Sequence, residues 1–421
     1  MKVLQIDAYN YIRGGAESVF KNTSSLLKAH GHEVMTFTLK WPENLPSEYA
    51  SYFPESKDTR RGISRIPLNI LTYFYHNEAA RNLDRLLKNE KPDIAHVHLI
   101  WGQLTPAILA VLHRHGIPVV HTAHDYRMVC PAYTFRNGRG EICHKCADGN
   151  FMHCVTNKCT KGSYLLSGMM AAEQYYRNHR FHPARNLDGI IYVSDFARDI
   201  HRRFMPELAE VPSERLYNFS NSIATVPISK DGRNEADTEP YYLYYGRLSY
   251  EKGLLTLMKA FAEMPDLRLK IMGSGPMEPQ LKQFADEHGM TNVNFIGRRT
   301  GQELMDIVAR AKFVIIPSEW YENNPMTIIE PYSLGVPVIG AEIGGIPEII
   351  TPDTGLTFKS GDSDSLKDTV RKSASISDER YDALANGALQ FARNNFESEE
   401  YYNRLIKFYT RIISSYKQKT K

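Results

Sequence analysis

The stretch KFVIIPSEWYENNPMTIIEPYSLGVPVIGA, residues 312–341, contains a complete strand–helix–strand repeat. FVIIP is an apolar run of strand length, and so is PVIGA. Between them, PMTIIEPYSLG has helical apolar spacing, begins with a proline that a first helical turn accepts, and ends at a glycine. A strand, a crossover helix and a second strand in this order predict a parallel sheet with helices packed on its faces.

The same alternation extends through the chain on both sides of this repeat. Predicted strands are KVLQIDAY, HEVMTFTL, DIAHVHL, IPVVHTAHD and GIIYVSDF in the first half, and YYLYYG, LRLKIMG and NVNFIG in the second. A length of 421 residues exceeds the usual size of one core. Around Asn221 the polar stretch SNSIATVPISKDGRNEADTEP favours a linker.

We therefore predict an α/β protein with two doubly wound, Rossmann-like domains that face a central cleft. The first domain spans residues 1–222 and the second residues 223–397. A last amphipathic helix, 398–421, is expected to pack back on the first domain.

Composition excludes several classes of protein. The net charge of +3 is not the strong basic excess of a nucleic-acid-binding protein. No stretch approaches the roughly 20 apolar residues that span a bilayer. The N-terminal MKVLQIDAYNYIRGG reads as a strand and not as a signal peptide. A cytoplasmic protein is expected, with any membrane contact peripheral and at the inner face of the cell membrane.

Charged residues follow two of the predicted strands of the second domain. In GRLSYEKG, residues 246–253, Arg247 and Lys252 flank a turn before a helix and are suited to neutralise a diphosphate. A solvated loop with capping charges is the alternative. Glu322, before a helix, and Glu330, inside it, lie eight positions apart (330 − 322) and are suited to accept hydroxyls of an elongated ligand such as a sugar nucleotide. The alternative for Glu330 is an acid on the helix surface.

These residues belong to a set of motifs that resembles glycosyltransferase family 4. The set comprises GG-x-E near the start, HD after a strand, GR-x4-KG, IMGSGP, E-x7-E, and GVPVI followed by GIPEI, in that order over nearly the whole chain. The resemblance implies the GT-B architecture and transfer of a sugar from a nucleoside-diphosphate donor with retention of anomeric configuration. It also implies that catalysis needs no metal ion.

The family resemblance assigns roles to individual residues. Arg247 and Lys252 would hold the donor diphosphate, Glu322 would lie beside the donor sugar, and Glu330 would bind the ribose hydroxyls. His124 would contact the sugar near its 6-position. With His124, Arg247, Lys252 and Glu322 as the catalytic set, the other donor-binding positions are Gly14, Gly15, Gly297, Asn324, Met326, Thr327 and Glu330.

The expected partners are a UDP- or GDP-sugar and a glycan or polyprenyl-diphosphate-linked acceptor, in the synthesis of bacterial surface polysaccharide or glycolipid. Two alternatives stay open: a non-catalytic sugar-nucleotide binder or scaffold on the same fold, and a nucleotide-sugar epimerase. An inactive binder would be expected to have lost an ionic position of the site. Since both acids and both cations named above are present, the enzyme is favoured.

All five cysteines fall in an insert, residues 130–160, after the HDY motif, which resembles that of a bacterial subgroup of the family. Cys143 and Cys146 form a CxxC pair and, with Cys130 and Cys159, predict a tetrahedral structural zinc site. In that reading Cys154 is spare. Reduced free thiols are the first alternative and disulfides the last. The following segment, GSYLLSGMMAAEQYYRNHRFHPARN, predicts a packed helix with a basic face, or alternatively an acceptor-side surface that touches an anionic membrane.

Overall fold

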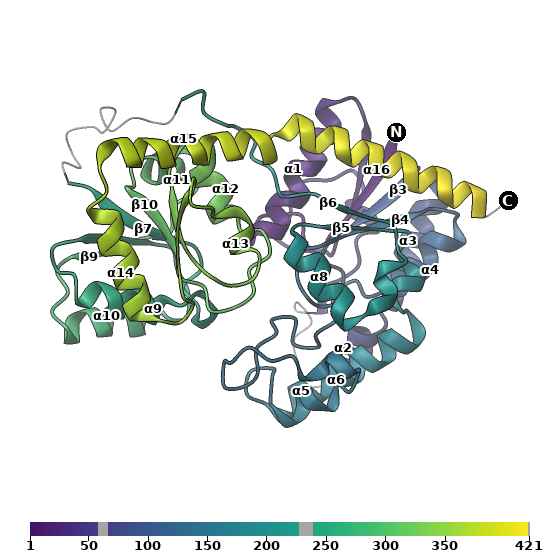
Figure 1. The fold of residues 1–421 in the computed structure, drawn as a ribbon. Helices are drawn as coiled ribbons and strands as arrows, with labels where there is room; N and C mark the ends of the chain where they lie inside the picture. Colours follow the sequence, from purple (N-terminus) through teal and green to yellow (C-terminus); the bar gives the residue numbers. More distant parts are fainter. Residues whose placement is uncertain (58–65, 227–238, 420–421) are drawn as a thin grey trace. The chain divides into compact units, whose positions relative to one another are not determined.

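The computed structural model describes residues 1–57, 66–226 and 239–419 (Figure 1). The chain forms two compact units: unit 1 is Met1–Leu216 with Tyr401–Lys421, and unit 2 is Tyr217–Glu400. Most of the predicted linker, residues 227–238, lies outside the described residues.

The division between the units falls before the predicted boundary at residue 222. Residues after Leu216 already bond to unit 2: the amide of Asn218 donates to Asn324 Oδ1 at 2.6 Å, and the amide of Ala224 donates to the carbonyl of Ser333 at 2.8 Å. Paired backbone groups attach this segment to the second core, although its composition is that of a linker.

Unit 1 contains a six-stranded sheet in the order β2-β1-β3-β4-β5-β6, in which every neighbouring pair is parallel. The strands are β1 Lys2–Ile6, β2 Glu33–Phe37, β3 Ile94–Val97, β4 Val119–Ala123, β5 Gly189–Tyr192 and β6 Ser213–Arg215. All residues of β3, β4 and β5 are buried, as expected for parallel strands covered by helices on both faces.

The helices of unit 1 include crossovers between these strands and an added group. The crossovers include α1 Gly15–Ala29, α3 Asn77–Asn89, α4 Ala107–Arg114 and α8 Asp195–Phe204. The added group is α2 Ile66–Phe74, α5 Met152–Thr156, α6 Tyr164–Arg180 and α7 Pro183–Asn186, and in Figure 1 α2, α5 and α6 lie together to one side of the sheet. The cysteine-rich insert belongs to this group.

The C-terminal helix, α16 Ser398–Lys419, packs on the sheet of unit 1. Its Tyr409 is fully buried and its hydroxyl lies 2.6 Å from Nδ1 of His96 in β3. At Gly189 in β5 a Cβ atom would come within 3.1 Å of Phe408 and Ile412 of this helix. The glycine therefore lets the helix approach the sheet closely.

Unit 2 repeats the architecture with a parallel sheet in the order β12-β11-β10-β7-β8-β9. The strands are β7 Tyr241–Tyr245, β8 Arg268–Met272, β9 Val293–Gly297, β10 Phe313–Ile316, β11 Val338–Ala341 and β12 Gly355–Phe358. The helices are α9 Leu254–Ala262, α10 Glu278–Glu287, α11 Gly301–Ala309, α12 Met326–Ser333, α13 Ile346–Ile349, α14 Ser363–Ala374 and α15 Asp378–Asn395. Apolar clusters on both faces of the sheet form its core.

The strand order locates the ligand-binding edge of each sheet. In unit 2 the chain builds outward from β7 through β8 to β9 and then returns to the other side of β7 as β10. In unit 1 it builds from β1 to β2 and returns beside β1 as β3. Ligands of open α/β sheets bind beyond the carboxyl ends of the strands at such reversals.

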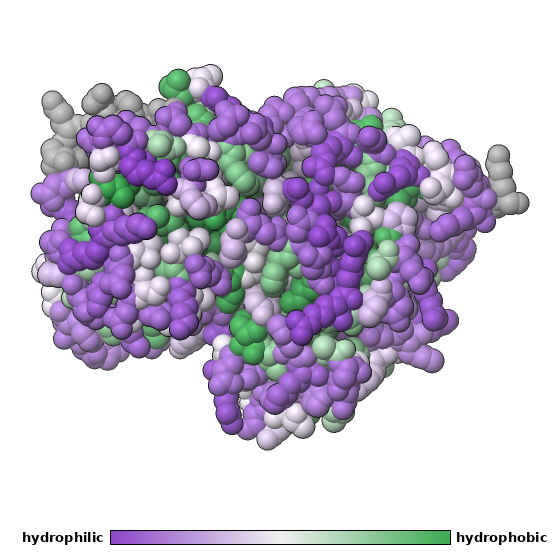
Figure 2. All heavy atoms as spheres, in the orientation of Figure 1, coloured by the Kyte–Doolittle hydropathy of each residue, from purple (hydrophilic) through white to green (hydrophobic). Residues whose placement is uncertain are grey.

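Hydrophilic residues predominate on the face of the molecule drawn in Figure 2, with apolar residues singly or in small groups. Among the described residues, no helix has the length and apolar content needed to cross a membrane.

Candidate functional site

The loops after β7 and β10 meet at the reversal point of unit 2. Gly253, at the end of the loop after β7, has φ +68°, and a Cβ atom there would lie 1.8 Å from the carbonyl oxygen of Pro317 in the loop after β10. The amide of Glu319 also donates to the carbonyl of Glu251 at 2.9 Å. Glycine at this position therefore permits a direct contact between the two loops that carry the predicted ionic residues.

Lys252 and Glu322 form an ion pair across this contact. Nζ of Lys252 lies 2.6 Å from Oε1 of Glu322, whose side chain is only 8% exposed. The same Oε1 accepts hydrogen bonds from Ser318 Oγ and Trp320 Nε1, each at 2.8 Å. Within the described part of the chain these contacts all use Oε1, so Oε2 stays available to a ligand hydroxyl.

Arg247 occupies a more open position in the same loop. Its side chain is 66% exposed, and Nη2 donates to Oε1 of Glu251 at 2.7 Å. The hydroxyl of Tyr244 donates to the Arg247 carbonyl at 2.9 Å and holds the backbone in place. Both predicted cations thus form an ion pair with a carboxylate. Because lysine has three N–H donors and arginine five, each keeps donors for an anionic ligand.

Glu330 lies inside α12, as the sequence predicts, but it is not a helix-surface acid. Its Oε2 atom accepts a hydrogen bond of 2.7 Å from the hydroxyl of Tyr245, the last residue of β7. Burial raises the pKa of Glu330, and the hydrogen bond from Tyr245 lowers it. The acid is therefore fixed at the carboxyl end of β7, where the ligand-binding edge begins.

The N-terminus of α12 supplies the remaining predicted contacts of unit 2. The helix begins at Met326 and Thr327, one residue later than predicted, with Pro325 as its N-cap. Its first N–H groups have no partner within the helix and are available to phosphate. Nδ2 of Asn324 is buried and forms no hydrogen bond with the described residues. Gly297 ends β9, and its carbonyl accepts from the amide of Gly273 at 2.9 Å.

Three of the residues predicted to contact the donor lie in unit 1. Gly14 and Gly15 form the N-terminus of α1 and are exposed. Close to them are two acids that the sequence motifs do not connect: Asp7, fully buried after β1, and Glu17, 7% exposed in the first turn of α1. Burial raises the pKa of both carboxyls, and the charge of Glu17 adds to the rise at Asp7.

His124, the third, ends a chain of buried side chains. Nε2 of His124 lies 2.8 Å from Nδ1 of His98, and Nε2 of His98 lies 3.0 Å from Oε1 of Gln5. The amide nitrogen of Gln5 lies 3.5 Å from Nδ1 of His96, to which the hydroxyl of Tyr409 also bonds. His96 and His98, which the sequence presents as strand-lining residues, thus connect His124 to the C-terminal helix.

The chain determines which nitrogen of His124 carries the proton. Burial lowers the pKa of His124 to about 3 and that of His98 well below its usual value, so both rings are neutral near pH 7. The oxygen of Gln5 accepts from Nε2–H of His98, which leaves Nδ1 of His98 as an acceptor. His124 must then donate through Nε2–H. Its Nδ1 atom then carries the lone pair and is a hydrogen-bond acceptor.

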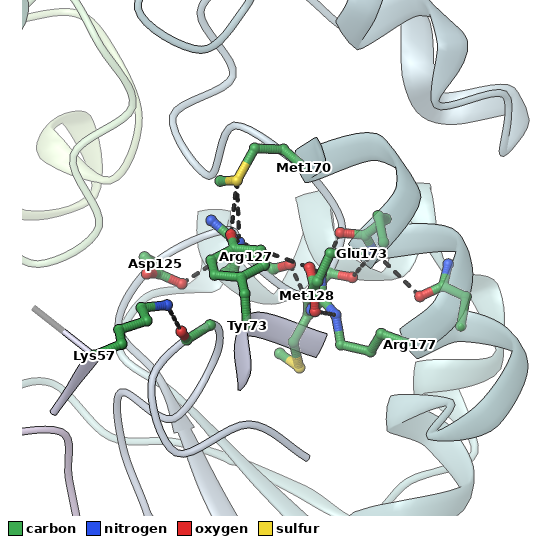
Figure 3. A network of polar contacts seen from close by, with 11 residues as sticks. Lys57, Tyr73, Asp125, Arg127, Met128, Met170, Glu173 and Arg177 are labelled. Carbon is green, nitrogen blue, oxygen red and sulfur yellow. Dashed lines mark hydrogen bonds and ion pairs between the residues drawn. The ribbon is translucent and has the colours of Figure 1, made fainter. Parts of the chain in front are cut away.

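The segment after His124 is anchored by a buried ionic network (Figure 3). Asp125 Oδ1 accepts from the amide of Arg127 at 2.9 Å, and the Arg127 guanidinium bonds to the Tyr73 hydroxyl of α2. Glu173 of α6 lies 3.6 Å from Arg127 Nη2 and 3.1 Å from Arg177 Nε. Two buried guanidiniums therefore share this carboxylate. No local pattern in the sequence joins these residues, because they come from three separate segments.

The cysteines of the insert gather around one small cavity, lined by Cys130, Cys143, Cys146, Cys154 and Cys159. All five are free thiols. Cys154, which the zinc prediction leaves as spare, is 1% exposed, and its thiol interacts directly with that of Cys159. Among the described residues, no group of three or more histidine, cysteine or acidic side chains is arranged to hold a metal ion. The zinc prediction gains no support.

In the comparison with known sequences, two glycosyltransferase family models together match most of the chain. Residues 13–219 match the model of Glycosyltransferase Family 4, and residues 226–390 match that of Glycosyl transferases group 1. The chain is 33% identical over 144 residues to the GDP-mannose-dependent monoacylated alpha-(1-6)-phosphatidylinositol monomannoside mannosyltransferase of Corynebacterium glutamicum, covering 32% of this chain and 38% of that protein. It is 29% identical over 288 residues to the glycogen synthase of Mycobacterium tuberculosis, covering 67% and 60%. In both cases the match spans less than two thirds of the relative.

Solved structures share the fold over nearly the full chain. Sucrose-phosphate synthase from Thermosynechococcus elongatus superposes with a TM-score of 0.72 at 17% identity, covering 98% of this chain and 99% of that one. Anabaena HepE in complex with UDP and glucose superposes with a TM-score of 0.63 at 18% identity, covering 97% and 98%. The two parallel six-stranded α/β units are therefore those of the GT-B fold, as the sequence predicts.

Proposed function

Because the chain belongs to glycosyltransferase family 4 and has its GT-B fold, we propose that it transfers a sugar from a nucleoside-diphosphate donor to a saccharide or lipid-linked saccharide. Transfer proceeds with retention of the anomeric configuration. The observation that carries the proposal is the Lys252–Glu322 pair at the reversal point of unit 2. It presents a cation for the diphosphate and a free carboxylate oxygen for the sugar next to one another.

Each ionic residue of unit 2 has a separate part in binding the donor. Lys252 and Arg247 neutralise the diphosphate, together with the N–H groups at the start of α12. Glu322 accepts a hydroxyl of the donor sugar through Oε2, and Glu330 accepts the ribose hydroxyls. For His124 we keep the role that the family resemblance implies, an acceptor of a sugar hydroxyl through Nδ1. The structure of Anabaena HepE in complex with UDP and glucose supports a donor of this class.

In the proposed reaction the bond between the anomeric carbon and the diphosphate oxygen breaks as the acceptor oxygen bonds to the same face of that carbon. The proton of the acceptor hydroxyl passes to the leaving diphosphate. The charge that develops on the diphosphate is stabilised by Lys252 and Arg247, and this stabilisation is their contribution to the rate. The chain's own acids bind hydroxyls and take no covalent part.

A panel of UDP-, GDP- and ADP-sugars tests the proposal by release of nucleoside diphosphate and by thermal shift. We expect one nucleotide class to stabilise the protein and to be turned over. Lys252→Ala and Glu322→Ala should each lower turnover roughly 10²-fold, the usual effect of removing a charge-stabilising donor. Lys259→Ala, an exposed lysine of α9 in the same unit, is the matched control.

The outcome also separates the enzyme from a binder. Stabilisation by a sugar nucleotide without turnover in the presence of acceptor glycans would favour a non-catalytic protein on the same fold. Full turnover by both Lys252→Ala and Glu322→Ala would contradict the site assignment itself.

A further inference from the structure

The cysteine-rich insert contains a second, basic pocket that the proposed transfer reaction does not use. The pocket has a volume of about 780 Å³ and is lined by residues from two stretches, 137–145 and 156–164. Its walls are the turn bridged by Arg136 and Ile142, the short helix Lys145–Asp148, and the start of α6. The whole pocket belongs to unit 1, in the insert that begins at Cys130, six residues after His124 (130 − 124).

The charges around this pocket favour an anion. Arg139, Lys145 and Lys158 line it, and Glu141 is the acid among its lining residues. The Glu141 carboxylate already accepts a hydrogen bond of 2.8 Å from Asn137 Nδ2. Within the described residues none of the three cations is in an ion pair, unlike Arg247 and Lys252. Three cations that line one pocket, without carboxylate partners among the described residues, attract a negatively charged ligand.

The aromatic ring of Tyr164 also lines this pocket. Tyr164 is 59% exposed, and Nζ of Lys158 lies 4.4 Å from the centre of its ring. An exposed tyrosine next to cations offers an apolar face and polar groups together, which suits the ring of a sugar that carries an acidic substituent. The combination distinguishes this pocket from a general basic surface.

The two stretches that line the pocket are joined through their backbones. The amide of Gly138 donates to the carbonyl of Asn157 at 2.8 Å, and a Cβ atom on Gly138 would lie 2.7 Å from the carbonyl oxygens of Asn157 and Lys158. Lys158 itself has φ +48°, in the left-handed region that non-glycine residues rarely adopt. Cys143 lines both this pocket and the thiol-lined cavity. Cys143 thus connects the pocket to the thiol cluster.

We propose that this pocket binds an acidic saccharide, through its carboxylate or phosphate group, as the recognition site for the acceptor. This role rests on the proposed sugar-transfer function, whereas binding itself does not. Arg139 and Lys158 contact the anionic group, and Tyr164 packs against the sugar ring. A uronic acid and a sugar phosphate present the same chemistry to these side chains, so the experiment uses both.

The test is isothermal titration of the full chain with a uronic-acid trisaccharide, a hexose 1-phosphate and a neutral trisaccharide. We expect at least one charged probe to bind and the neutral trisaccharide to bind at least tenfold more weakly. Lys158→Glu and Arg139→Glu should each weaken binding of the charged probe at least tenfold. Lys161→Glu is the matched control, because Lys161 has nearly the same backbone conformation, φ +50°, in the same turn but does not line the pocket.

Binding by only one charged probe identifies carboxylate or phosphate as the preferred group and supports the proposal. Failure of both charged probes to bind, equal binding of the neutral trisaccharide, or equal losses in Lys161→Glu would overturn it. Donor hydrolysis and nucleotide-induced thermal shift are measured in parallel and should be unchanged in all three variants. A protein that binds the acidic probe but turns over no sugar nucleotide would refute the transfer function and leave the binding site standing.

Discussion

Nε2 of His124 lies 2.8 Å from Nδ1 of His98, and this contact decides what His124 can offer a ligand. We expect nitrogen-15 spectra of the ligand-free protein to show His124 as the neutral tautomer with its proton on Nε2. The reason is that Oε1 of Gln5 accepts the Nε2–H of His98, which leaves Nδ1 of His98 as an acceptor for His124. A His124 signal with the proton on Nδ1, or a charged ring near pH 7, would refute the assignment.

His98→Asn tests the consequence of that contact for turnover. Loss of one hydrogen bond of about 1 kcal/mol should lower the rate of sugar transfer roughly fivefold, with little change in nucleotide affinity. His121→Asn is the control. His121 is buried in β4, the strand next to β3, and its Nδ1 lies 3.1 Å from the carbonyl of Val97, outside the series of side chains that joins His124 to Tyr409. Equal losses in both variants would mean that His98 acts only through packing.

Tyr245→Phe should weaken nucleotide binding through Glu330. The variant removes the hydroxyl that donates to Glu330 Oε2 at 2.7 Å, so the buried carboxylate loses a partner and its pKa rises further. Tyr242→Phe is the matched control, because Tyr242 lies in the same strand and its hydroxyl bonds to Ser373 Oγ at 2.8 Å in the core, away from Glu330. Both variants should lose about 1 kcal/mol of unfolding free energy. Only Tyr245→Phe should raise the dissociation constant for the nucleotide, by several-fold in calorimetric titration.

Acid should destabilise unit 1 before unit 2. Burial lowers the pKa of eight histidines, and all of them lie in unit 1: His32, His96, His98, His121, His124, His144, His182 and His201. The pKa falls to about 3 for His121 and about 4 for His201. Below about pH 6.5 these histidines therefore bind protons in the unfolded chain but not in the folded chain. Stability falls with decreasing pH until the pH reaches the pKa values of the histidines in the folded state.

Three buried acids of unit 1 act in the opposite direction. Burial raises the pKa of Asp7, Glu17 and Asp125, so the folded state binds more protons than the unfolded state at these carboxyls. The eight histidines outnumber these three acids, and the net effect on unit 1 is acid instability. Unit 2 contains a single histidine, His288, which is exposed. Hydrogen exchange corrected for intrinsic rates, at about pH 7.5 and about pH 5.5, should show protection lost in β3 and β4 but kept in β7 and β10. Loss in unit 2 first would contradict the prediction.

The sequence predicts most of the fold because apolar periodicity and glycine stops are local signals. They locate ten of the twelve strands that the structure describes, missing β6 and β12, and they place Glu322 in a loop and Glu330 in a helix. The strand order then explains why Glu322 lies beside Lys252. Parallel strands bring their carboxyl ends to one edge, so residues after different strands become neighbours without any signal that names the partner.

Contacts that join distant segments are not predictable in this way. His96 and Tyr409 are 313 positions apart in the sequence, yet their side chains bond. Arg127 and Glu173 belong to a loop and a later helix, and neither lies in a recognisable motif. Periodicity identifies a buried face but not the polar group that compensates a buried charge on it. The tautomer of His124 therefore depends on residues that the motifs do not include.

The final prediction concerns the thiol-lined cavity. Which of two serine variants loses more unfolding free energy, Cys154→Ser or Cys143→Ser, depends on whether the cysteines bind zinc. In the structure Cys154 is 1% exposed and its thiol interacts with Cys159, whereas Cys143 is only partly buried. Cys154→Ser should therefore cost about 1–3 kcal/mol of unfolding free energy, the usual penalty for a polar group left in a buried site. Cys143→Ser should stay within about 0.5 kcal/mol, as for most surface changes. A zinc site of Cys130, Cys143, Cys146 and Cys159 would reverse the order, since loss of a ligand removes folding free energy supplied by the metal while Cys154 would be dispensable. Chemical unfolding of both variants, with elemental analysis of the parent protein, decides between the two arrangements.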